Sequence, residues 1–348
     1  MNNKQKFGQF FTTNYNHILQ SLSIPSNVNH IIEPFAGNKD LIKYLNENYS
    51  NREFKIDCYD IDPKHDDIIM RDTLKDPPNF TGTYVLSNPP YLARNKSKDK
   101  TLYDQYNTND LYKCFIKILI SSPCLGGIII IPLNFLSSIR KCDIDLRKRF
   151  VELYHIELVN IFEEKVFEDT SYTVCSIQFN FKENNDENKT KFQIYPSNKL
   201  IETRLEETNN YTIGGGIYNL RKSNTYKVDR ATKLTKNKDT ISNILLKCLD
   251  DSPQNMIQLR IVDDETKDKY VDRTDKLSAR SYATLVITPK LDKETSEILV
   301  KKFNDYLNSE REKYHSLFLS NYRESKEIAR KRISFKFAFD LCSHLLSD

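Results

Sequence analysis

The segment Ser87-Asn88-Pro89-Pro90-Tyr91 places a side-chain amide, two prolines and an aromatic ring directly after a short apolar run, Tyr84-Val85-Leu86. These residue types suit a reaction at a planar exocyclic amine, which is a poor nucleophile because its lone pair is delocalised into the ring. The Asn88 side-chain oxygen and the Pro89 carbonyl can accept the two amine hydrogens and localise that lone pair in the transition state. Pro89 stiffens the turn through its fixed φ, and Tyr91 can stack on the ring that carries the amine.

A Pro-Pro pair on its own more often marks an ordinary loop, so this chemistry needs support from other segments. One such segment is Glu33-Pro34-Phe35-Ala36-Gly37, which lies between an apolar stretch at 28–35 and a predicted helix at 40–49. Its small residues let the backbone approach a ligand, and the following helix points its positive end into the same space. Glu33 can receive the ammonium group of a ligand that contains an amino acid.

Two aspartates stand where the next predicted strands end. Asp60 closes a strand at 54–59, about two dozen residues after the glycine turn, where an acid can accept two ribose hydroxyls. Asp72 follows a short apolar segment at 68–70 and can accept a hydrogen bond from an adenine amino group. Each residue taken alone is equally well explained as a solvated or helix-capping aspartate.

These side chains require a scaffold that brings strand ends together. Further strands are predicted at 127–132, 156–161 and 172–181, and further helices at about 110–120 and 146–153. The four consecutive isoleucines Ile128–Ile131 are typical of a strand buried on both faces of a parallel sheet. Alternating strands and helices with a closing strand pair predict a doubly wound α/β sheet, in which ligands bind at the carboxyl ends of the strands.

Taken together, these segments resemble the gamma group of DNA adenine-N6 methyltransferases, which depend on S-adenosylmethionine and occur in type II restriction-modification. The resemblance covers residues 7–181, in the motif order of that group. Gly8-Gln9-Phe10-Phe11-Thr12 is similar to motif X, which contacts the methionine part of the cofactor. Glu33 to Gly37 resembles motif I, Asp60 motif II, Asp72 motif III, and Asn88 to Tyr91 motif IV. Leu111-Tyr112-Lys113-Cys114-Phe115 looks like motif V, and Gly126 to Pro132 is similar to the family strand that follows.

The resemblance implies a Rossmann-like methyltransferase fold, a mixed sheet with helices on both faces, and the cofactor S-adenosyl-L-methionine without a metal. It implies a site-specific enzyme that methylates the N6 amine of an adenine flipped out of duplex DNA. Val166-Phe167 resembles the segment that supplies a second aromatic ring against the base, with Tyr172 as the alternative. The catalytic residues it implies are Asn88, Pro89, Pro90, Tyr91 and Phe167. The cofactor-binding residues it implies are Phe11, Thr12, Glu33, Pro34, Ala36, Gly37, Asp60, Ile61, Asp72 and Phe115.

One position departs from the family pattern. The motif I turn usually carries a second glycine two places after the first, and Lys39 stands there in this chain. The backbone geometry near the methionine carboxylate is therefore in question, although the Lys39 side chain can compensate.

Length and charge predict two parts. A chain of 348 residues exceeds what one core usually holds, and we expect a catalytic domain at 1–200 and a target-recognition domain of α+β type at 201–348. Residues 201–348 hold 27 Lys+Arg and 23 Asp+Glu, which is the whole formal net charge of +4. That surplus is a mild sign of a surface facing a polyanion, here double-stranded DNA.

Within the second part, 206–216 with its three glycines is predicted to be a linker, hinge or tight turn, and 293–343 to be helical. The basic run Ala329–Arg332, followed by Phe335, Phe337 and Phe339, fits phosphate contact and equally fits a helix and strand docked on the core.

Composition also limits the location. The longest apolar stretch, Cys124–Leu136, is too short to cross a bilayer, and the first residues lack an apolar signal region. Seven cysteines without a CxxC pair argue for reduced thiols and against a zinc site. We expect a cytoplasmic protein, or one held at a nucleoid or viral factory through DNA, that is neither secreted nor bound to a membrane. A cognate restriction endonuclease acting separately is a candidate partner.

Four other functions are compatible with parts of the pattern. Cytosine-N4 methylation uses the same turn, and so does methylation of a protein glutamine or of RNA. Glutamine methyltransferases, however, carry their substrate domain before the cofactor domain, whereas the extra module here is C-terminal. Glu163-Glu164-Lys165 contains the E-x-K of some nucleases but lacks a preceding Pro-Asp strand end, so we interpret it as a solvated turn. A DNA-binding protein with an inactive methylase fold is the fourth.

Overall fold

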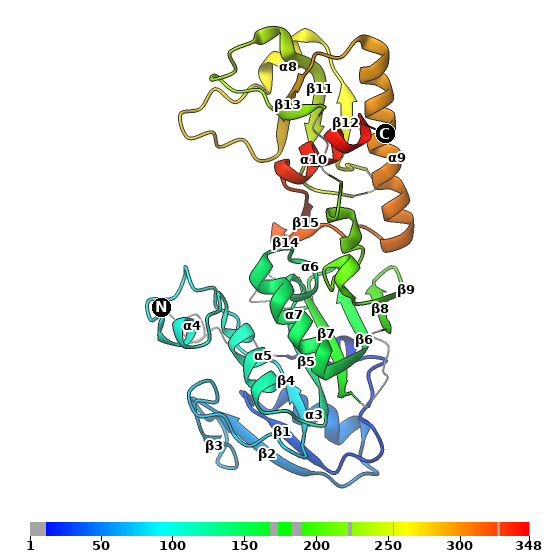
Figure 1. Cartoon of the computed structure of the whole chain (residues 1–348). Helices are drawn as coiled ribbons and strands as arrows, with labels where there is room; N and C mark the ends of the chain where they lie inside the picture. The colour runs from blue at the N-terminus through cyan, green and yellow to red at the C-terminus, as the bar shows by residue number, and fades with distance from the viewer. Residues whose placement is uncertain are drawn as a thin grey trace. The chain divides into compact units, whose positions relative to one another are not determined.

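The computed structural model describes residues 12–167, 173–182, 189–221, 225–252, 254–325 and 328–347. The chain divides into two compact units, shown in Figure 1. The first comprises Met1–Glu207 with Glu324–Ile328, and the second comprises Thr208–Arg323 with Ala329–Asp348. The recognition role expected for the second part stays a prediction.

A nine-stranded mixed sheet forms the centre of the described part of the first unit, with strand order β3-β2-β1-β4-β5-β7-β6-β8-β9. Its strands are β1 (His30–Glu33), β2 (Lys55–Asp60), β3 (Ile69–Met70), β4 (Tyr84–Ser87), β5 (Gly126–Pro132), β6 (Tyr154–Phe162), β7 (Val174–Phe181), β8 (Lys189–Tyr195) and β9 (Lys199–Arg204). The first five strands are parallel to their neighbours, and β7 runs antiparallel to both β5 and β6. The strand order reverses direction between the neighbouring strands β1 and β4, and the carboxyl ends of these two parallel strands lie at the same edge of the sheet.

The residues of β5 explain its central place. All seven residues are buried, and the run of isoleucines supplies apolar surface to both faces of the sheet. Gly127 lets β4 and β7 approach, because a Cβ on it would lie 2.5 Å from the Val85 carbonyl and 3.0 Å from the Phe179 ring. The prediction of a strand buried on both faces is therefore confirmed.

The helices of this unit follow the predicted alternation. They are α2 (Tyr15–Ile18), α3 (Asp40–Asn48), α4 (Thr101–Gln105), α5 (Leu111–Ser121), α6 (Asn134–Ser137) and α7 (Lys141–Leu153). Helix α2 packs against α3, and α5 packs against α7 and α4. A mixed sheet with α/β alternation and the antiparallel strand β7 confirms the predicted methyltransferase-like α/β class.

The second unit is built on a four-stranded antiparallel sheet with strand order β10-β13-β11-β12. Its strands are β10 (Lys227–Arg230), β11 (Ile241–Lys247), β12 (Gln258–Ile261) and β13 (Tyr282–Thr288). The helices are α8 (Asp264–Lys269), α9 (Lys293–Tyr314) and α10 (Phe335–Leu345), with short 3-10 helices η1 (Glu207–Asn209), η2 (Gly215–Tyr218) and η3 (Lys238–Thr240). One core joins Phe303 and Leu307 of α9 and Leu341 of α10 to Leu246 and Leu285 of the sheet.

One expectation for this unit is corrected. The continuous helical end predicted for 293–343 is interrupted, because α9 stops where His315 and Ser316 take left-handed φ values of 49° and 59°. Two short strands, β14 (Ser320–Ser325) and β15 (Ile328–Arg332), pair before α10 begins. The four strands of the antiparallel sheet lie between 227 and 288, a stretch in which the sequence placed no individual strand.

The glycine-rich segment at 206–216 is a packed turn rather than an open linker. Tyr211, Thr212 and Ile213 are buried, and a Cβ on Gly215 would lie 1.9 Å from the Thr212 hydroxyl. Gly214 takes φ +64°, and a Cβ there would meet the ring of Tyr314 at 2.7 Å. These contacts require glycine for close packing and not for mobility.

No helix in the described ranges combines the length and the apolar character needed to span a bilayer.

Candidate active site

Asn88 stands at the end of β4, where its amide is held from two sides. Its Nδ2 donates a hydrogen bond to the Thr12 hydroxyl at 3.0 Å, and its Oδ1 accepts one from the Tyr91 hydroxyl. Thr12 is 3% exposed, so motif X and motif IV, 76 residues apart in sequence, meet at a buried contact. The bond to Thr12 directs the amide oxygen of Asn88 away from Thr12, which is the orientation an acceptor of amine hydrogens needs.

Tyr91 lies inside the protein in this structure. Its side chain is 2% exposed, its hydroxyl lies 2.6 Å from the Ile130 carbonyl of β5, and its ring meets Tyr112 edge-on at 6.2 Å. Burial raises the pKa of the Tyr91 hydroxyl well above its usual value. Stacking on a base therefore requires Tyr91 to turn outward, and that role stays a prediction.

The other residues predicted to hold the base are placed in part. Pro89 is buried and Pro90 half-buried beside Asn88. Phe167 is 5% exposed, so it too offers little ring surface in this conformation. Its alternative Tyr172 lies outside the described residues, as does the motif X segment up to Phe11.

Glu33 at the end of β1 is a buried carboxyl group. It is 2% exposed, and its Oε2 has no hydrogen-bond partner among the described residues. Desolvation, together with the nearby charges of Asp40 and Asp60, raises its pKa well above the ordinary value, while Lys39 acts in the opposite direction. A buried acceptor without a partner is costly, and a ligand ammonium group would satisfy it.

Asp60 joins the ends of β1 and β2. Its Oδ2 accepts the backbone N–H of Gly37 and its Oδ1 accepts that of Asp62, both at 2.8 Å. The carboxylate thus fixes the glycine turn, in which Gly37 takes φ 49°, and ribose binding would use its remaining lone pairs. The neighbouring Ile61 is 38% exposed and offers an apolar surface beside it.

Motif III is tied to motif I through Thr73, which sequence reasoning missed. The Thr73 hydroxyl donates to the Pro34 carbonyl at 2.9 Å, and Ala36, further along the same turn, is 3% exposed. Asp72 itself forms an ion pair with Lys75 at 3.2 Å. Recognition of adenine by Asp72 stays a prediction, and an adenine amino group would have to compete with the exposed Lys75 for the carboxylate.

Lys39 resolves the departure from the family pattern. It is the N-cap of α3 and takes the left-handed conformation, with φ 60° and ψ 30°, which a glycine adopts without steric cost. Its ammonium group forms an ion pair with Asp67. The turn therefore keeps the backbone shape that glycine would give, and the side chain points to the loop after β2.

Phe115 is part of the core. It has no exposed surface, and its ring packs edge-on against Phe35 at 5.0 Å and lies 6.1 Å from Phe80. A contact between Phe115 and the cofactor stays a prediction, and in this structure Phe35 and Phe80 pack against its ring. The half-buried Phe35 is the member of this group with exposed surface.

Asp110, a residue that sequence reasoning missed, connects the motif IV loop to α5. Its Oδ1 accepts the backbone N–H of Leu92 at 3.1 Å, and Ala93 pairs with Asp110 as an isolated bridge. Burial raises the pKa of Asp110 to about 6. The signal available in sequence was its place at the start of the helix predicted for about 110–120, where aspartate is common.

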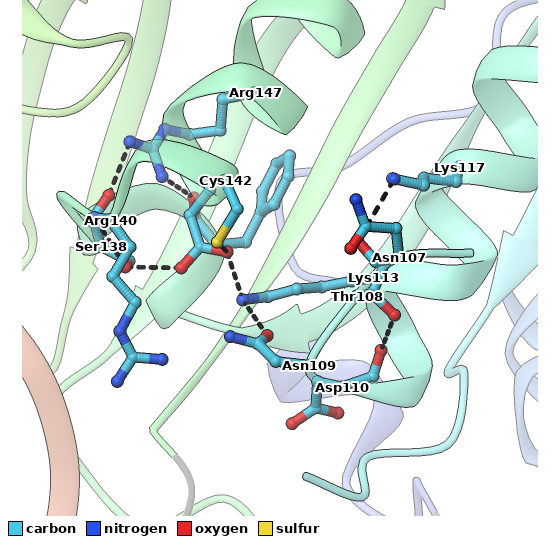
Figure 2. A network of polar contacts seen from close by, with 12 residues as sticks. Asn107, Thr108, Asn109, Asp110, Lys113, Lys117, Ser138, Arg140, Cys142 and Arg147 are labelled. Atoms are coloured by element: carbon cyan, nitrogen blue, oxygen red, sulfur yellow. Dashed lines mark hydrogen bonds and ion pairs between the residues drawn. The ribbon is translucent and has the colours of Figure 1, made fainter. Parts of the chain in front are cut away.

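Beyond Asp110, a buried ionic network links α5 to α7 (Figure 2). Lys113 Nζ lies 2.6 Å from Asp143 Oδ1 and 2.9 Å from Asn109 Oδ1. Ser138 donates to the other oxygen of Asp143 at 2.6 Å, and Arg147, with no exposed surface, donates to the Ser138 carbonyl at 2.7 Å. The network fixes the helix that carries motif V, with Lys113 paired to Asp143 and the Arg147 guanidinium bonded to the backbone carbonyls of Phe135 and Ser138.

The sequence profile described as N-6 DNA Methylase matches residues 54–230 of this chain. No curated protein matches the chain.

Three solved structures are similar in fold at low identity. A modification subunit described as part of a type I restriction enzyme of Vibrio vulnificus YJ016 is 11% identical, with TM-score 0.43, over 60% of this chain and 51% of that one. A type I restriction-modification methyltransferase subunit of Streptococcus thermophilus is 16% identical, with TM-score 0.40, over 54% and 48%. A protein of Listeria monocytogenes described as a class I S-adenosylmethionine-dependent methyltransferase is 12% identical, with TM-score 0.39, over 51% and 61%. The chain spans about half to three fifths of the length of these three.

The methylase family implies S-adenosylmethionine as the cofactor, and the residues present fit it. The unsatisfied Glu33 carboxyl suits the ammonium group, the glycine turn fixed by Asp60 leaves backbone close to the ligand, and Ile61 offers apolar surface. No group of three His, Cys, Asp or Glu side chains within the described ranges is arranged to hold a metal ion.

Proposed function

We propose that this chain, which belongs to the N-6 DNA methylase family, methylates the N6 amine of adenine in duplex DNA. The observation that carries the proposal is the Asn88 amide at the end of β4, held by the buried Thr12 with its oxygen directed away. A fixed oxygen acceptor at a strand end is what activation of a delocalised amine requires.

Bound S-adenosylmethionine supplies an electrophilic methyl group on a sulfonium. Asn88 Oδ1 and the Pro89 carbonyl accept the two N6 hydrogens, which localises the nitrogen lone pair for attack on the methyl carbon. Held at Glu33 and Asp60, the cofactor would supply the methyl group and keep the electron pair of the broken C–S bond on sulfur, and the methylated amine would then lose one proton to water. Thr12 keeps the amide in the accepting orientation throughout.

The target base is reached by rotation out of the duplex, at a cost of a few kcal/mol. Stacking on Tyr91 and Phe167, once these rings turn outward, returns about 1–3 kcal/mol. During this change the Tyr91 hydroxyl leaves the oxygens of Asn88 and Ile130 between which it lies, and one amine hydrogen replaces it on the Asn88 oxygen.

Incubation of the purified chain with duplex DNA and tritium-labelled S-adenosylmethionine, followed by digestion to nucleosides, tests this function. The label is expected in the N6-methylated adenine nucleoside of the DNA. Label in N4-methylated cytosine would show that cytosine is the target base instead of adenine. Label in protein or RNA alone would contradict the proposal. A chain that binds DNA but transfers no label would be an inactive methylase fold.

A further inference from the structure

Two loops of the second unit lie side by side. The first, at 231–240, follows β10, and the second, at 271–280, precedes β13. Their backbones are joined where Thr232 and Asp272 form a bridge, with Lys233 N–H donating to the Asp272 carbonyl at 3.0 Å and Asp272 N–H to the Ala231 carbonyl at 2.9 Å. The two loops therefore form one surface, here called the paired loops.

A buried ion pair braces the paired loops from beneath. Asp272 is 5% exposed and lies 3.1 Å from Arg230 Nη1. The guanidinium group also donates to the Ala279 and Leu277 carbonyls at 3.2 and 3.1 Å, and Asp272 accepts the backbone N–H groups of Thr274 and Ala279. Because the Asp272 carboxylate accepts several hydrogen bonds within its own loop and pairs with Arg230, the paired loops have a fixed shape.

At the tip of the first loop, that fixed shape presents a leucine to solvent. Leu234 is 68% exposed, and its N–H donates to the Thr232 hydroxyl at 3.1 Å. The Thr235 N–H donates to the Thr232 carbonyl, and the Thr235 hydroxyl accepts the Thr232 N–H, each at 3.0 Å. An exposed leucine on a turn locked by threonines is suited to insertion into a partner, because holding it out costs little entropy on binding.

The surroundings of Leu234 are cationic. The paired loops contain six Lys or Arg against three Asp, and one of those three, Asp272, is the buried partner of Arg230. Twenty residues thus carry a surplus of three positive charges, compared with four for the whole chain. The exposed cations are Lys233, Lys236, Lys238, Arg273, Lys276 and Arg280.

In the other basic stretch, at 329–332, the described Lys331 is not open to solvent. Lys331 is 7% exposed, and Ile333 and Phe337 beyond it are buried in the core that also contains Leu341. Of the two interpretations left open by the sequence, the structure favours the docked one.

We infer that the paired loops are a duplex DNA contact surface, in which the lysines bind backbone phosphates and Leu234 touches the bases. The inference rests on the proposed function for its choice of polyanion and adds where on the second unit the DNA binds. Cations that face phosphates provide sequence-independent affinity, and apolar side chains inserted between base steps are a known way to deform a duplex.

Charge removal tests the phosphate contacts. In the variant Lys236→Gln/Lys238→Gln/Lys276→Gln, none of the three lysines forms an ion pair with a described residue, so only the surface charge changes. The dissociation constant for a fluorescein-labelled mixed-sequence duplex, followed by anisotropy, is expected to rise at least tenfold. The slope of log affinity against log salt should fall by about 0.9 for each phosphate that the variant no longer neutralises.

The matched control removes the same charge elsewhere in the second unit. Lys293→Gln/Lys301→Gln/Lys302→Gln changes three exposed residues of α9, where Lys301 pairs with Asp305 at 2.7 Å. We expect its affinity and salt slope to stay within about twofold of the wild type. Equal weakening in both triple variants, or none in the first, would overturn the assignment of the surface.

Leu234→Ala tests the apolar contact separately. It is expected to weaken duplex binding about fivefold with an unchanged salt slope, whereas Ile298→Ala, at 47% exposure on α9, is expected to have no effect. Wild-type affinity of Leu234→Ala would remove the leucine from the interface.

The binding measurements test the DNA contact surface separately from the methylation assay, which tests the proposed function. If label enters adenine while the paired-loop variants bind normally, the surface is wrong and the function stands. If the variants bind more weakly although the wild type transfers no label, the surface stands and the function is wrong.

Discussion

At the scale of single residues, the contact between Thr12 and Asn88 decides how the candidate catalytic amide is oriented. In the structure Asn88 Nδ2 donates to the Thr12 hydroxyl and Oδ1 accepts from the Tyr91 hydroxyl, so the two bonds together hold the amide in one orientation. Thr12 was expected to serve the cofactor, and the structure shows that it also holds Asn88. It is therefore a candidate positioning residue in addition to a candidate cofactor contact.

Asn88→Ala is expected to lower kcat by about 10²–10³-fold, the usual effect of removing one transition-state hydrogen bond, while S-adenosylmethionine binding survives. Thr12→Val should lower kcat by about tenfold because the amide is freed, and Thr12→Ser should restore it. Single-turnover rates and calorimetric cofactor affinity separate the two effects. Turnover near wild type in Asn88→Ala would contradict the amine pocket.

Glu33 supplies a prediction that depends on pH. Its pKa is raised in the folded protein, so the folded state holds the proton more tightly than the unfolded state. The stability contributed by this group is full below about pH 4.3, its unfolded pKa, and is lost as pH rises through the folded pKa. Glu33→Gln removes that loss and should raise Tm relative to wild type more at about pH 8 than at about pH 5.

The same variant should bind S-adenosylmethionine more weakly by about 1.5–3 kcal/mol, because it cannot form a charge-assisted bond to the ammonium group. In the wild type, affinity should increase with pH as Glu33 ionises, and binding should release a proton. Calorimetry in buffers of different ionisation enthalpy measures that proton. An affinity of Glu33→Gln equal to wild type would separate Glu33 from the cofactor.

At the scale of elements, Asp110 is the joint between the motif IV loop and α5. The N–H of Leu92 is held by a carboxylate at the start of the helix, and Tyr103 donates to the Leu92 carbonyl at 2.9 Å. The residue directly after Tyr91 is thus fixed from both sides. Movement of the Tyr91 ring must then occur by side-chain rotation, with little displacement of this backbone.

Asp110→Ala is expected to lower kcat severalfold and to destabilise the protein by about 1–3 kcal/mol, since the Leu92 N–H is left without an acceptor. Asp110→Asn keeps an acceptor and should retain activity. Because the folded pKa of Asp110 is about 6 and the unfolded value is about 3.9, wild-type stability from this group falls as pH rises between those values. Urea midpoints at about pH 4 and about pH 7 should show a smaller difference in Asp110→Asn.

The elements also show what sequence alone can predict. The strands that end at Glu33, Asp60 and Ser87 were predicted because apolar runs followed by turn residues carry a strong local signal. In the second unit, strand Lys227–Arg230 was not placed from the sequence because it is short and mostly polar, whereas Tyr282–Thr288 carries an apolar run that was not assigned. The inward position of Tyr91 had no local signal, since it depends on the Ile130 carbonyl 39 residues away.

At the scale of the whole molecule, the exposure of the cysteines shows how well the cores of the two units exclude solvent. Six of the seven are buried, in both units, and Cys142 is exposed. Burial raises the pKa of Cys58 to about 12 and those of Cys114 and Cys124 to about 11. A thiolate is the reactive form, so these buried groups should be inert in the native state.

A chromogenic disulfide reagent is therefore expected to react rapidly with one thiol in the native protein and with all seven after unfolding in guanidinium. Cys142→Ser should abolish the rapid phase and leave the six slow thiols. Several fast thiols in the native protein would show that one of the cores opens readily. Separate fast and slow groups on mild denaturation would indicate that the two units unfold independently.

The packed glycines have a consequence for exchanging specificity between enzymes of this kind. Because Gly214 and Gly215 are wedged against Tyr314 and Thr212, the stretch that looks in sequence like a flexible tether belongs to the second fold. A chimaera joined within this segment would lose part of the packing of the second unit. The first compact unit gives way to the second upstream, between Glu207 and Thr208, and takes up Glu324–Ile328 again, so an exchange has to respect both boundaries.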